Sequence, residues 1–192
     1  MVDTTGPVVT VPADLAVAAT SSTGARVSFT APSATDLVDG SVQPRCDRAS
    51  GTMFAPGTTT VSCSATDAAG NTTTKRFTVA VSYAWSGLQS PVVAGDSYNL
   101  GRTLPLKFAL TGASAPVSDL IAKVYLAKVS DKVAGPETAA VSTSAADNGN
   151  TFRRDGSAYV FNLATKNLTA GTWRVRTDLG DGVRHTVDVV LR

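Results

Sequence analysis

The chain has 192 residues and a formal net charge of +2 at pH 7, and 43 % of its residues are hydrophobic. This hydrophobic fraction supports a packed core and excludes a chain that is disordered throughout. The small, dispersed charge excludes the basic stripe of a nucleic-acid-binding protein, and no apolar run approaches the ~20 residues of a membrane-spanning helix. We therefore expect no nucleic-acid partner and no membrane insertion.

Residue usage predicts an all-β protein. Thr, Val, Ala, Ser and Gly dominate the sequence, and Glu137 is its only glutamate. Long helices rely on Glu, Lys, Leu and Gln, whereas β-branched residues fit a pleated, half-buried surface. The length fits one large domain or two domains of ordinary size.

In the first half, strong turn signals separate short strands. Strands are expected at residues 8–11, 25–30 and 59–66, followed by a returning strand. Alternation predicts two inward-facing sets, which are Val61, Cys63 and Ala65, then Phe77, Val79 and Val81. Turn signals at about ten-residue intervals are typical of a β-sandwich.

The second half repeats this style. Its predicted inward-facing residues are Leu104, Leu106, Phe108 and Leu110, then Tyr159, Phe161 and Leu163, then Trp173 and Val175, and finally Val187, Val189 and Leu191. Residues 121–129 fit either a strand or one short helix. Residues 136–150 predict a long excursion of small residues, with a weak strand near Val141.

The boundary between the halves is predicted near Ser82. Tyr83 and Trp85 keep the alternation of the preceding strand, so they extend the same face just past the first sandwich. We interpret these rings as packed between the domains. The alternative is an exposed aromatic surface that contacts a ligand, with Tyr98 as a further candidate.

The residues needed for common hydrolytic mechanisms are not found in the sequence. The single histidine, His185, lies at the start of the last predicted strand, and no Gly-x-Ser-x-Gly elbow occurs. A glycosidase pair would have to come from aspartates, and these lie mostly in turns. We expect His185 to be a hydrogen-bonded structural residue and the chain not to be an enzyme.

Two aspartate-containing loops raise the question of a metal. Asp36, Asp39, Asp67 and Asn71 lie in loops that would meet at one end of the sandwich, and Asp3 lies at the domain entrance. Loop oxygens are the ligands that Ca²⁺ prefers. The same spacings are also ordinary turn chemistry, with glycine supplying the positive φ. We favour turns and expect no cofactor; calcium is the alternative.

The two cysteines, Cys46 and Cys63, have a spacing that fits neither a Cys-x-x-Cys redox pair nor a zinc site. One structural disulfide in an oxidising compartment is the favoured interpretation. Two buried thiols in a cytosolic protein are the alternative.

Ordered motifs through the first half resemble the HYR (hyalin repeat) module. They are Asp3-x-x-x-Pro7, Val27-Ser28-Phe29-x-x-Pro32-x-Ala34-x-Asp36, Val38-Asp39-Gly40, Cys46, Gly51, Phe54-Ala55-Pro56-Gly57-Thr58-Thr59-Thr60-Val61-Ser62-Cys63 and Ala65-Thr66-Asp67-Ala68-Ala69-Gly70-Asn71. The resemblance covers nearly all of residues 1–82. It implies an immunoglobulin-like sandwich, a Cys46–Cys63 bridge and an extracellular role in adhesion or as an accessory module.

The second half, residues 83–192, resembles the bacterial PxKF module. The motifs are Asn99-Leu100-Gly101-Arg102-Thr103-Leu104, Pro105-Leu106-Lys107-Phe108, Tyr159-Val160-Phe161-Asn162-Leu163-Ala164-Thr165-Lys166 and Leu179-Gly180-Asp181-Gly182 before His185. Members often carry cysteines in this half, and this chain has none there, with Trp173 near a position where one is common. The resemblance implies a second immunoglobulin-like sandwich, in a pairing found in the tails of secreted bacterial hydrolases and surface proteins.

Together these features predict two tandem immunoglobulin-like β-sandwich domains in a secreted or cell-surface bacterial protein. We expect a non-catalytic accessory tandem that spaces, stabilises or docks a neighbouring domain of a larger protein. The alternative is a carbohydrate-binding or cell-adhesion module whose partner is a polysaccharide or cell surface, with Tyr83, Trp85 and Tyr98 as ligand contacts.

Overall fold

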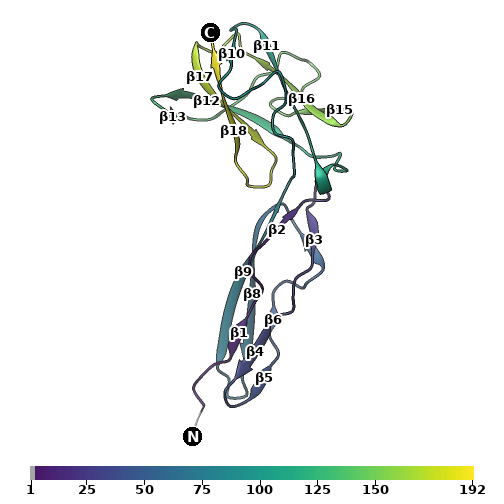
Figure 1. Ribbon diagram of the computed structural model, residues 1–192, viewed down its shortest axis with the longest axis vertical. Coiled ribbons are helices and arrows are strands. Elements are labelled where there is room, and N and C mark those ends of the chain that lie inside the picture. The colour runs from purple at the N-terminus through teal and green to yellow at the C-terminus, as the bar shows by residue number, and fades with distance from the viewer. Residues whose placement is uncertain (1–2) are drawn as a thin grey trace. The chain divides into compact units, whose positions relative to one another are not determined.

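The computed structural model describes residues 3–192, which form an all-β protein with two compact units (Figure 1). The first unit comprises residues 3–18 and 23–82, and the second comprises residues 19–22 and 83–192. Both are immunoglobulin-like sandwiches, as predicted. Among residues 3–192 the structure has no helix long and apolar enough to cross a membrane.

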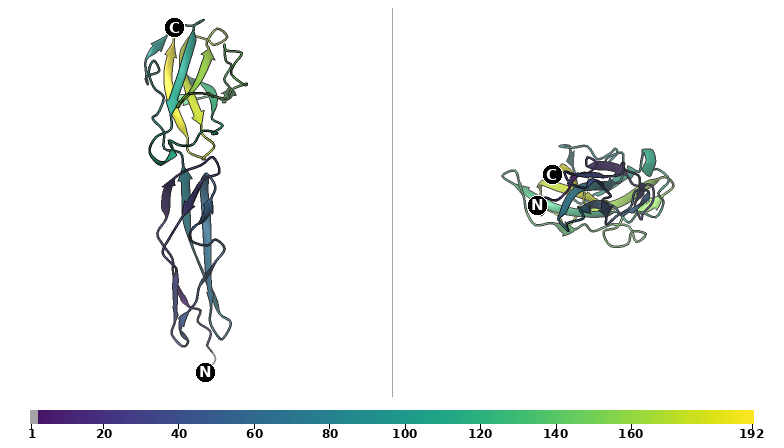
Figure 2. Two further views of the ribbon diagram at one scale, coloured as in Figure 1. Left: turned by 90° about the vertical axis from the view of Figure 1, so that its right-hand side faces the viewer. Right: turned by 90° about the horizontal axis from the view of Figure 1, so that it is seen from below.

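The first unit is built from nine strands in three hydrogen-bonded groups. The strand order is β2-β9-β8-β6 in the largest group, β1-β4-β5 in the second and β3-β7 in the third. The strands are β1 (Val8–Thr10), β2 (Leu15–Ala18), β3 (Ala25–Val27), β4 (Ser33–Asp36), β5 (Gly40–Val42), β6 (Arg45–Cys46), β7 (Thr52–Phe54), β8 (Gly57–Thr66) and β9 (Thr72–Ser82). The β8–β9 hairpin is the longest antiparallel pair and runs along this unit (Figure 2).

The core of the first unit follows the predicted alternation. Side chains of β8 and β9 that point inward are at most 3 % exposed, namely Val61, Cys63, Ala65, Phe77, Val79 and Val81. Because successive residues of a strand face opposite sides, these six side chains form one continuous apolar surface across the hairpin.

Cys46 and Cys63 form a disulfide, which confirms the favoured interpretation of the two cysteines. They are directly opposite each other on the antiparallel strands β6 and β8, with 4.0 Å between their Cα atoms. The bond closes a segment of 17 residues, and a crosslink of that span stabilises a fold by about 3 kcal/mol in the chain-entropy model.

We predict that Cys46→Ser, or reduction of the wild type, lowers the stability of the first unit by about 3 kcal/mol and leaves the second unchanged. Both tryptophans, Trp85 and Trp173, lie in the second unit, so their fluorescence reports its unfolding. Hydrogen exchange in β8 and β9 reports the first unit. An equal loss in both units would contradict two independent cores.

The observed strands of the first unit differ from the expected ones in several places, since β4 and β7 were also not predicted. The strand expected at residues 25–30 ends at Val27, because the Ser50 hydroxyl accepts a hydrogen bond from the Phe29 N–H and donates one to the Phe29 carbonyl. A side chain therefore takes the place of a strand partner at Phe29. The strand β2 was not expected, and it pairs in parallel with β9, with Leu15 opposite Val79.

Gly24 allows β3 and β7 to begin their pairing. Its φ is +118°, and a Cβ built there would lie 1.8 Å from the Phe54 carbonyl oxygen. Both the backbone angle and the space therefore require glycine. Gly51 also has a positive φ, +81°, but its nearest neighbour would be the Ser28 hydroxyl at 4.0 Å.

Gly24→Ala is therefore predicted to destabilise the first unit by more than 3 kcal/mol, and Gly51→Ala by about 1–2 kcal/mol, because only the first adds a backbone clash to the strain of a positive φ. Chemical denaturation monitored by hydrogen exchange in the first unit measures both. Similar losses in the two variants would contradict the close approach of Phe54 to Gly24.

The second unit holds a sheet of order β10-β18-β17-β12-β13, with β14 also paired to β12, and a sheet of order β11-β16-β15. Its elements are β10 (Ser97–Tyr98), β11 (Thr103–Ala109), the 3₁₀ turn η1 (Gly112–Ser114), β12 (Lys123–Ser130), β13 (Val133–Ala134), β14 (Thr138–Ala139), β15 (Arg153–Asp155), β16 (Ala158–Ala164), β17 (Gly171–Asp178) and β18 (His185–Leu191). The segment expected as strand or helix is thus the strand β12.

Aromatic packing fills the second core. Phe108 stacks on Tyr159 with ring centroids 4.9 Å apart, and Phe152 meets Phe108 edge-on at the same separation. The predicted inward faces of β11 and β16 are buried as expected. Trp173 was expected in the core, but it is only partly buried. Its indole N–H donates to the Thr169 carbonyl, and the Lys128 ammonium lies 5.1 Å from its ring centre.

The long excursion over residues 136–150 contains the short strand β14, and Val141 is 60 % exposed. Asp147 anchors this segment. Its carboxylate accepts hydrogen bonds from the Ser142 hydroxyl, the Asn162 N–H and the Arg153 guanidinium. Burial alone would raise the pKa of Asp147, but these donors outweigh it and hold the pKa below its ordinary value.

A carboxyl whose pKa is lowered on folding stabilises the protein above its unfolded pKa, near 4, and loses that contribution as the pH falls through the folded pKa. We predict that Asp147→Asn costs the second unit about 1–3 kcal/mol at pH 7 and that the difference from wild type shrinks below pH 4. Urea unfolding followed by tryptophan fluorescence measures this. Asp131→Asn, at an exposed turn, is the matched control; a difference that does not vary with pH would contradict the role of the charge.

Candidate functional site

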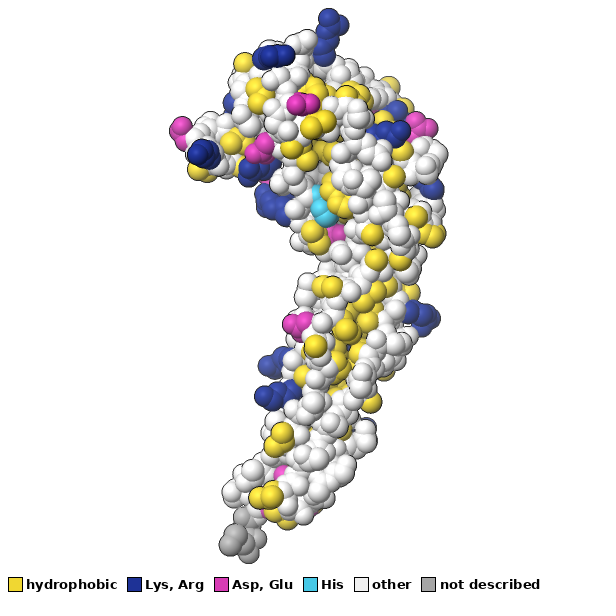
Figure 3. Space-filling view, in the orientation of Figure 1, with side chains coloured by type: hydrophobic (Ala, Val, Ile, Leu, Met, Phe, Trp, Pro, Cys, Tyr) yellow, Lys and Arg dark blue, Asp and Glu magenta, His cyan; other side chains and the backbone are white. Residues whose placement is uncertain are grey.

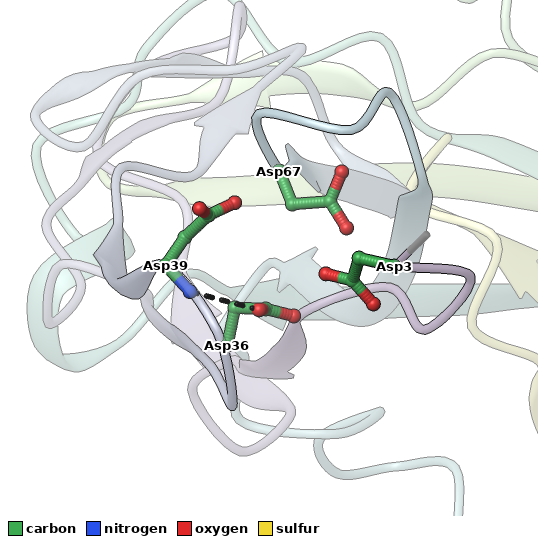
Figure 4. Close-up of side chains that lie close together, drawn as sticks. All are labelled: Asp3, Asp36, Asp39 and Asp67. Carbon is green, nitrogen blue, oxygen red and sulfur yellow. Dashed lines mark hydrogen bonds between the residues drawn. The ribbon is translucent and has the colours of Figure 1, made fainter. Parts of the chain in front are cut away.

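Four aspartates of the first unit gather at one place, although they come from three separate parts of the chain (Figure 4). Asp3, Asp36, Asp39 and Asp67 each offer a carboxylate oxygen, and these four oxygens lie within 4.8 Å of one another. We call this group the aspartate cluster. Figure 4 shows the four carboxylates turned toward a common space.

Strand pairing explains how distant residues meet there. Asp36 ends β4, and the β4–β5 turn that follows presents Asp39. Asp67 follows β8 at the start of the turn into β9. Asp3 lies on the segment that leads into β1, which pairs with β4.

Glycine brings the segment of Asp3 close to the β8–β9 turn. A Cβ at Gly6 would lie 2.8 Å from the Thr73 hydroxyl, so a larger residue would require the Thr73 side chain to move. The Asn71 side-chain amide then donates to the Asp3 carbonyl oxygen at 3.2 Å.

Backbone amides hold one oxygen of each carboxylate in the β4–β5 loop. Asp36 Oδ1 accepts from the N–H groups of Val38 and Asp39, at 2.8 and 3.1 Å. Asp39 Oδ2 accepts from the Ala68 N–H at 2.7 Å, which ties this loop to the β8–β9 turn. The Asp36 bonds are the local turn bonds that the sequence predicted, whereas the Asp39 bond joins two separate loops.

Asn71 holds both oxygens of Asp67. The Asn71 N–H donates to Asp67 Oδ1 at 2.7 Å, and its side-chain amide donates to Oδ2 at 2.8 Å. Burial raises the pKa of Asp67, but hydrogen bonds from the Asn71 side chain and from turn amides outweigh this effect, so the pKa lies below its ordinary value. Asn71, considered as a calcium ligand from the sequence, instead turns its amide N–H to the carboxylate and orients it.

One fully buried oxygen of the cluster has no hydrogen-bond partner among residues 3–192. Asp3 Oδ1 accepts from the Thr5 N–H at 3.0 Å, but Asp3 Oδ2 is buried and accepts no hydrogen bond from any of residues 3–192. No lysine or arginine in the described part of the chain forms an ion pair with the four aspartates. The cluster therefore offers hard oxygen donors that could hold a divalent cation.

The candidate ligand-contacting aromatics all belong to the second unit. Tyr83 is 4 % exposed, its N–H donates to Asp181 Oδ2 and its hydroxyl donates to the Ser22 carbonyl. Burial, followed by the charge of Asp181, raises the pKa of Tyr83. Little of this ring is therefore left to meet a ligand.

Trp85 and Tyr98 are both partly buried. The Trp85 ring lies edge-on to Phe108, with 5.5 Å between ring centres. The Tyr98 hydroxyl accepts from the Val93 N–H and donates to the Pro91 carbonyl, each at 2.8 Å. These contacts are made inside the second unit, so the three aromatics serve its packing first.

His185 was expected to be a hydrogen-bonded structural residue, and this is wrong for one of its nitrogens. Its Nε2 is buried without a hydrogen-bond partner among the described residues and lies 4.0 Å from Asp181 Oδ1. Both Asp181 oxygens already accept from the N–H groups of Tyr83 and Val183. The His185 ring is held instead by Trp85, with 4.6 Å between ring centres.

Comparisons with solved structures return multidomain proteins of low similarity. The extracellular domains 3–5 of Drosophila OTK match at 13 % identity and a TM-score of 0.35, covering 94 % of this chain and 58 % of that chain. A Salmonella α2-macroglobulin variant matches at 15 % identity and a TM-score of 0.36, covering 84 % of this chain and 11 % of that chain. The Bacteroides ovatus SGBP-B, in complex with a mixed-linkage heptasaccharide, matches at 14 % identity and a TM-score of 0.27, covering 99 % and 48 %.

The chain spans less than two thirds of the length of each of these structures. No curated protein sequence matches it. The model of the HYR domain family, however, matches residues 2–81, which include all four aspartates of the cluster and both cysteines of the disulfide. The first part of this chain, residues 2–81, is therefore similar to the HYR domain family.

Proposed function

We propose that the chain is a non-catalytic extracellular pair of modules that spaces, stabilises or docks a neighbouring domain of a larger secreted or surface bacterial protein. Its first domain is the HYR module, and residues 83–192 form a second immunoglobulin-like module of the PxKF type. In this function the two folded β-sandwiches act as structural elements.

The observation that carries this proposal is the disulfide-linked HYR module. HYR is an extracellular domain, and the Cys46–Cys63 disulfide persists in an oxidising compartment. Lysine and arginine side chains are scattered over the face drawn in Figure 3 rather than gathered in a stripe. Such a surface suits a module that stays soluble beside other domains more than one that recruits a polyanion.

A second function, binding of a polysaccharide or cell surface, has one observation in its favour. Trp85, Tyr98 and Trp173 are each only partly buried in the second unit. A partly exposed aromatic ring offers an apolar face together with a polar edge, which is the chemistry that stacks on a sugar ring. It corresponds to the carbohydrate-binding or cell-adhesion module that the sequence offered as the alternative.

A glycan array and a polysaccharide pull-down of the wild-type chain separate the two functions. We predict no saturable binding for a pair of structural modules. Trp85→Ala and Trp173→Ala are tested in parallel, each checked for folding by thermal unfolding. Saturable binding by wild type that falls about tenfold in either folded variant would refute the structural role and establish a carbohydrate-binding module.

A further inference from the structure

We infer that the aspartate cluster is a calcium site, held by the carboxylates of Asp3, Asp36, Asp39 and Asp67. The site belongs to the HYR domain alone, so it does not depend on the proposed function of the whole chain. It lies at the end of the first unit where the N-terminal segment, the β4–β5 turn and the β8–β9 turn meet (Figure 4).

Backbone amides occupy only one oxygen in three of the four carboxylates. N–H groups donate to Asp3 Oδ1, Asp36 Oδ1 and Asp39 Oδ2, whereas Asn71 donates to both oxygens of Asp67. Within residues 3–192, the second oxygens of Asp3, Asp36 and Asp39 accept no hydrogen bond. Turn formation therefore explains only one oxygen of each of these three carboxylates.

Parts of the aspartate cluster are largely removed from water. Asp36 is 8 % exposed, and Asp3 Oδ2 is buried with no hydrogen-bond donor among residues 3–192. A charged oxygen that is removed from water without a partner destabilises the fold, and three further carboxylates within 4.8 Å increase that cost by repulsion. A cation bound between the four carboxylates would remove both the cost of the unpartnered oxygen and the repulsion between the charges.

The ligand atoms of the cluster are all carboxylate oxygens, which favours Ca²⁺ over other metal ions. Carboxylate oxygens from loops, bound through one or two oxygens and completed by water, are the ligands of Ca²⁺. The cluster contains no nitrogen or sulfur ligand, which disfavours zinc and copper. Its donors also sit on three separate loops, an arrangement that suits the larger and less regular coordination of Ca²⁺ better than the strict octahedron of Mg²⁺.

Calorimetric titration of the EDTA-treated chain with CaCl₂ tests this directly, with MgCl₂ as the comparison. We expect one Ca²⁺ per chain with a dissociation constant below about 1 mM, and weaker or undetectable binding of Mg²⁺. Saturating Ca²⁺ should raise the melting temperature of the first unit by about 4–8 °C and leave the tryptophan-monitored second unit unchanged.

Asp39→Asn is the informative variant, because asparagine retains an oxygen to accept from the Ala68 N–H while it removes a charge. We expect at least a tenfold loss of Ca²⁺ affinity. In EDTA its melting temperature should equal or exceed that of wild type, since repulsion within the cluster falls. Asp47→Asn, an exposed aspartate of the same unit whose Oδ1 accepts from the Ser62 N–H, is the matched control and should bind as wild type does.

Any one of four outcomes would overturn the assignment. The first is that folded wild type binds no Ca²⁺ at concentrations up to 10-fold above about 1 mM. The second is that Mg²⁺ binds as tightly as Ca²⁺, and the third is that Asp39→Asn has unchanged Ca²⁺ affinity. A lower melting temperature of Asp39→Asn in EDTA, by the same amount as in Ca²⁺, would also overturn it, because a turn-forming aspartate loses stability equally in both conditions.

Discussion

The backbone ladder between β8 and β9 is the interaction on which the first domain depends. Its ten residue pairs run from Gly57 opposite Val81 to Thr66 opposite Thr72. The inner face of this ladder supplies the apolar core, and β2 and β6 extend it on either side. The disulfide joins its middle to β6, and its turn presents Asp67 to the aspartate cluster. Core, crosslink and candidate site therefore share one element.

Much of this could be predicted from the sequence because it rests on local periodicity. Alternation identified the buried faces of β8, β9, β11 and β16, since a strand repeats every two residues whatever its partners are. The strand β2 could not be found in this way. Its four residues, Leu-Ala-Val-Ala, pair in parallel with residues 64 positions later, and no turn signal marks such a pairing.

The candidate site, too, could be predicted from the sequence only where local turn patterns mark its residues. Asp36, Asp39 and Asp67 belong to turns whose glycines are visible in the sequence, so their meeting was a stated alternative. Asp3 joins them through tertiary contacts that no local pattern marks, namely the approach of Gly6 to Thr73 and the hydrogen bond from the Asn71 side chain to the Asp3 carbonyl. His185 shows the same limit, since its unpaired nitrogen follows from Asp181 already accepting two backbone amides.

The turn and calcium interpretations of these aspartates are not exclusive, because a carboxylate has two oxygens. In Asp36 and Asp39 one oxygen fixes the loop through backbone amides, and the same bonds direct the second oxygen toward the cluster. Folding of the loops thus assembles like charges that the loops alone do not neutralise. Local conflict of this kind is expected where a fold serves a ligand, since residues chosen only for stability would avoid it. The first unit would then gain part of its stability from a bound cation, through ligands that its own loops had already placed.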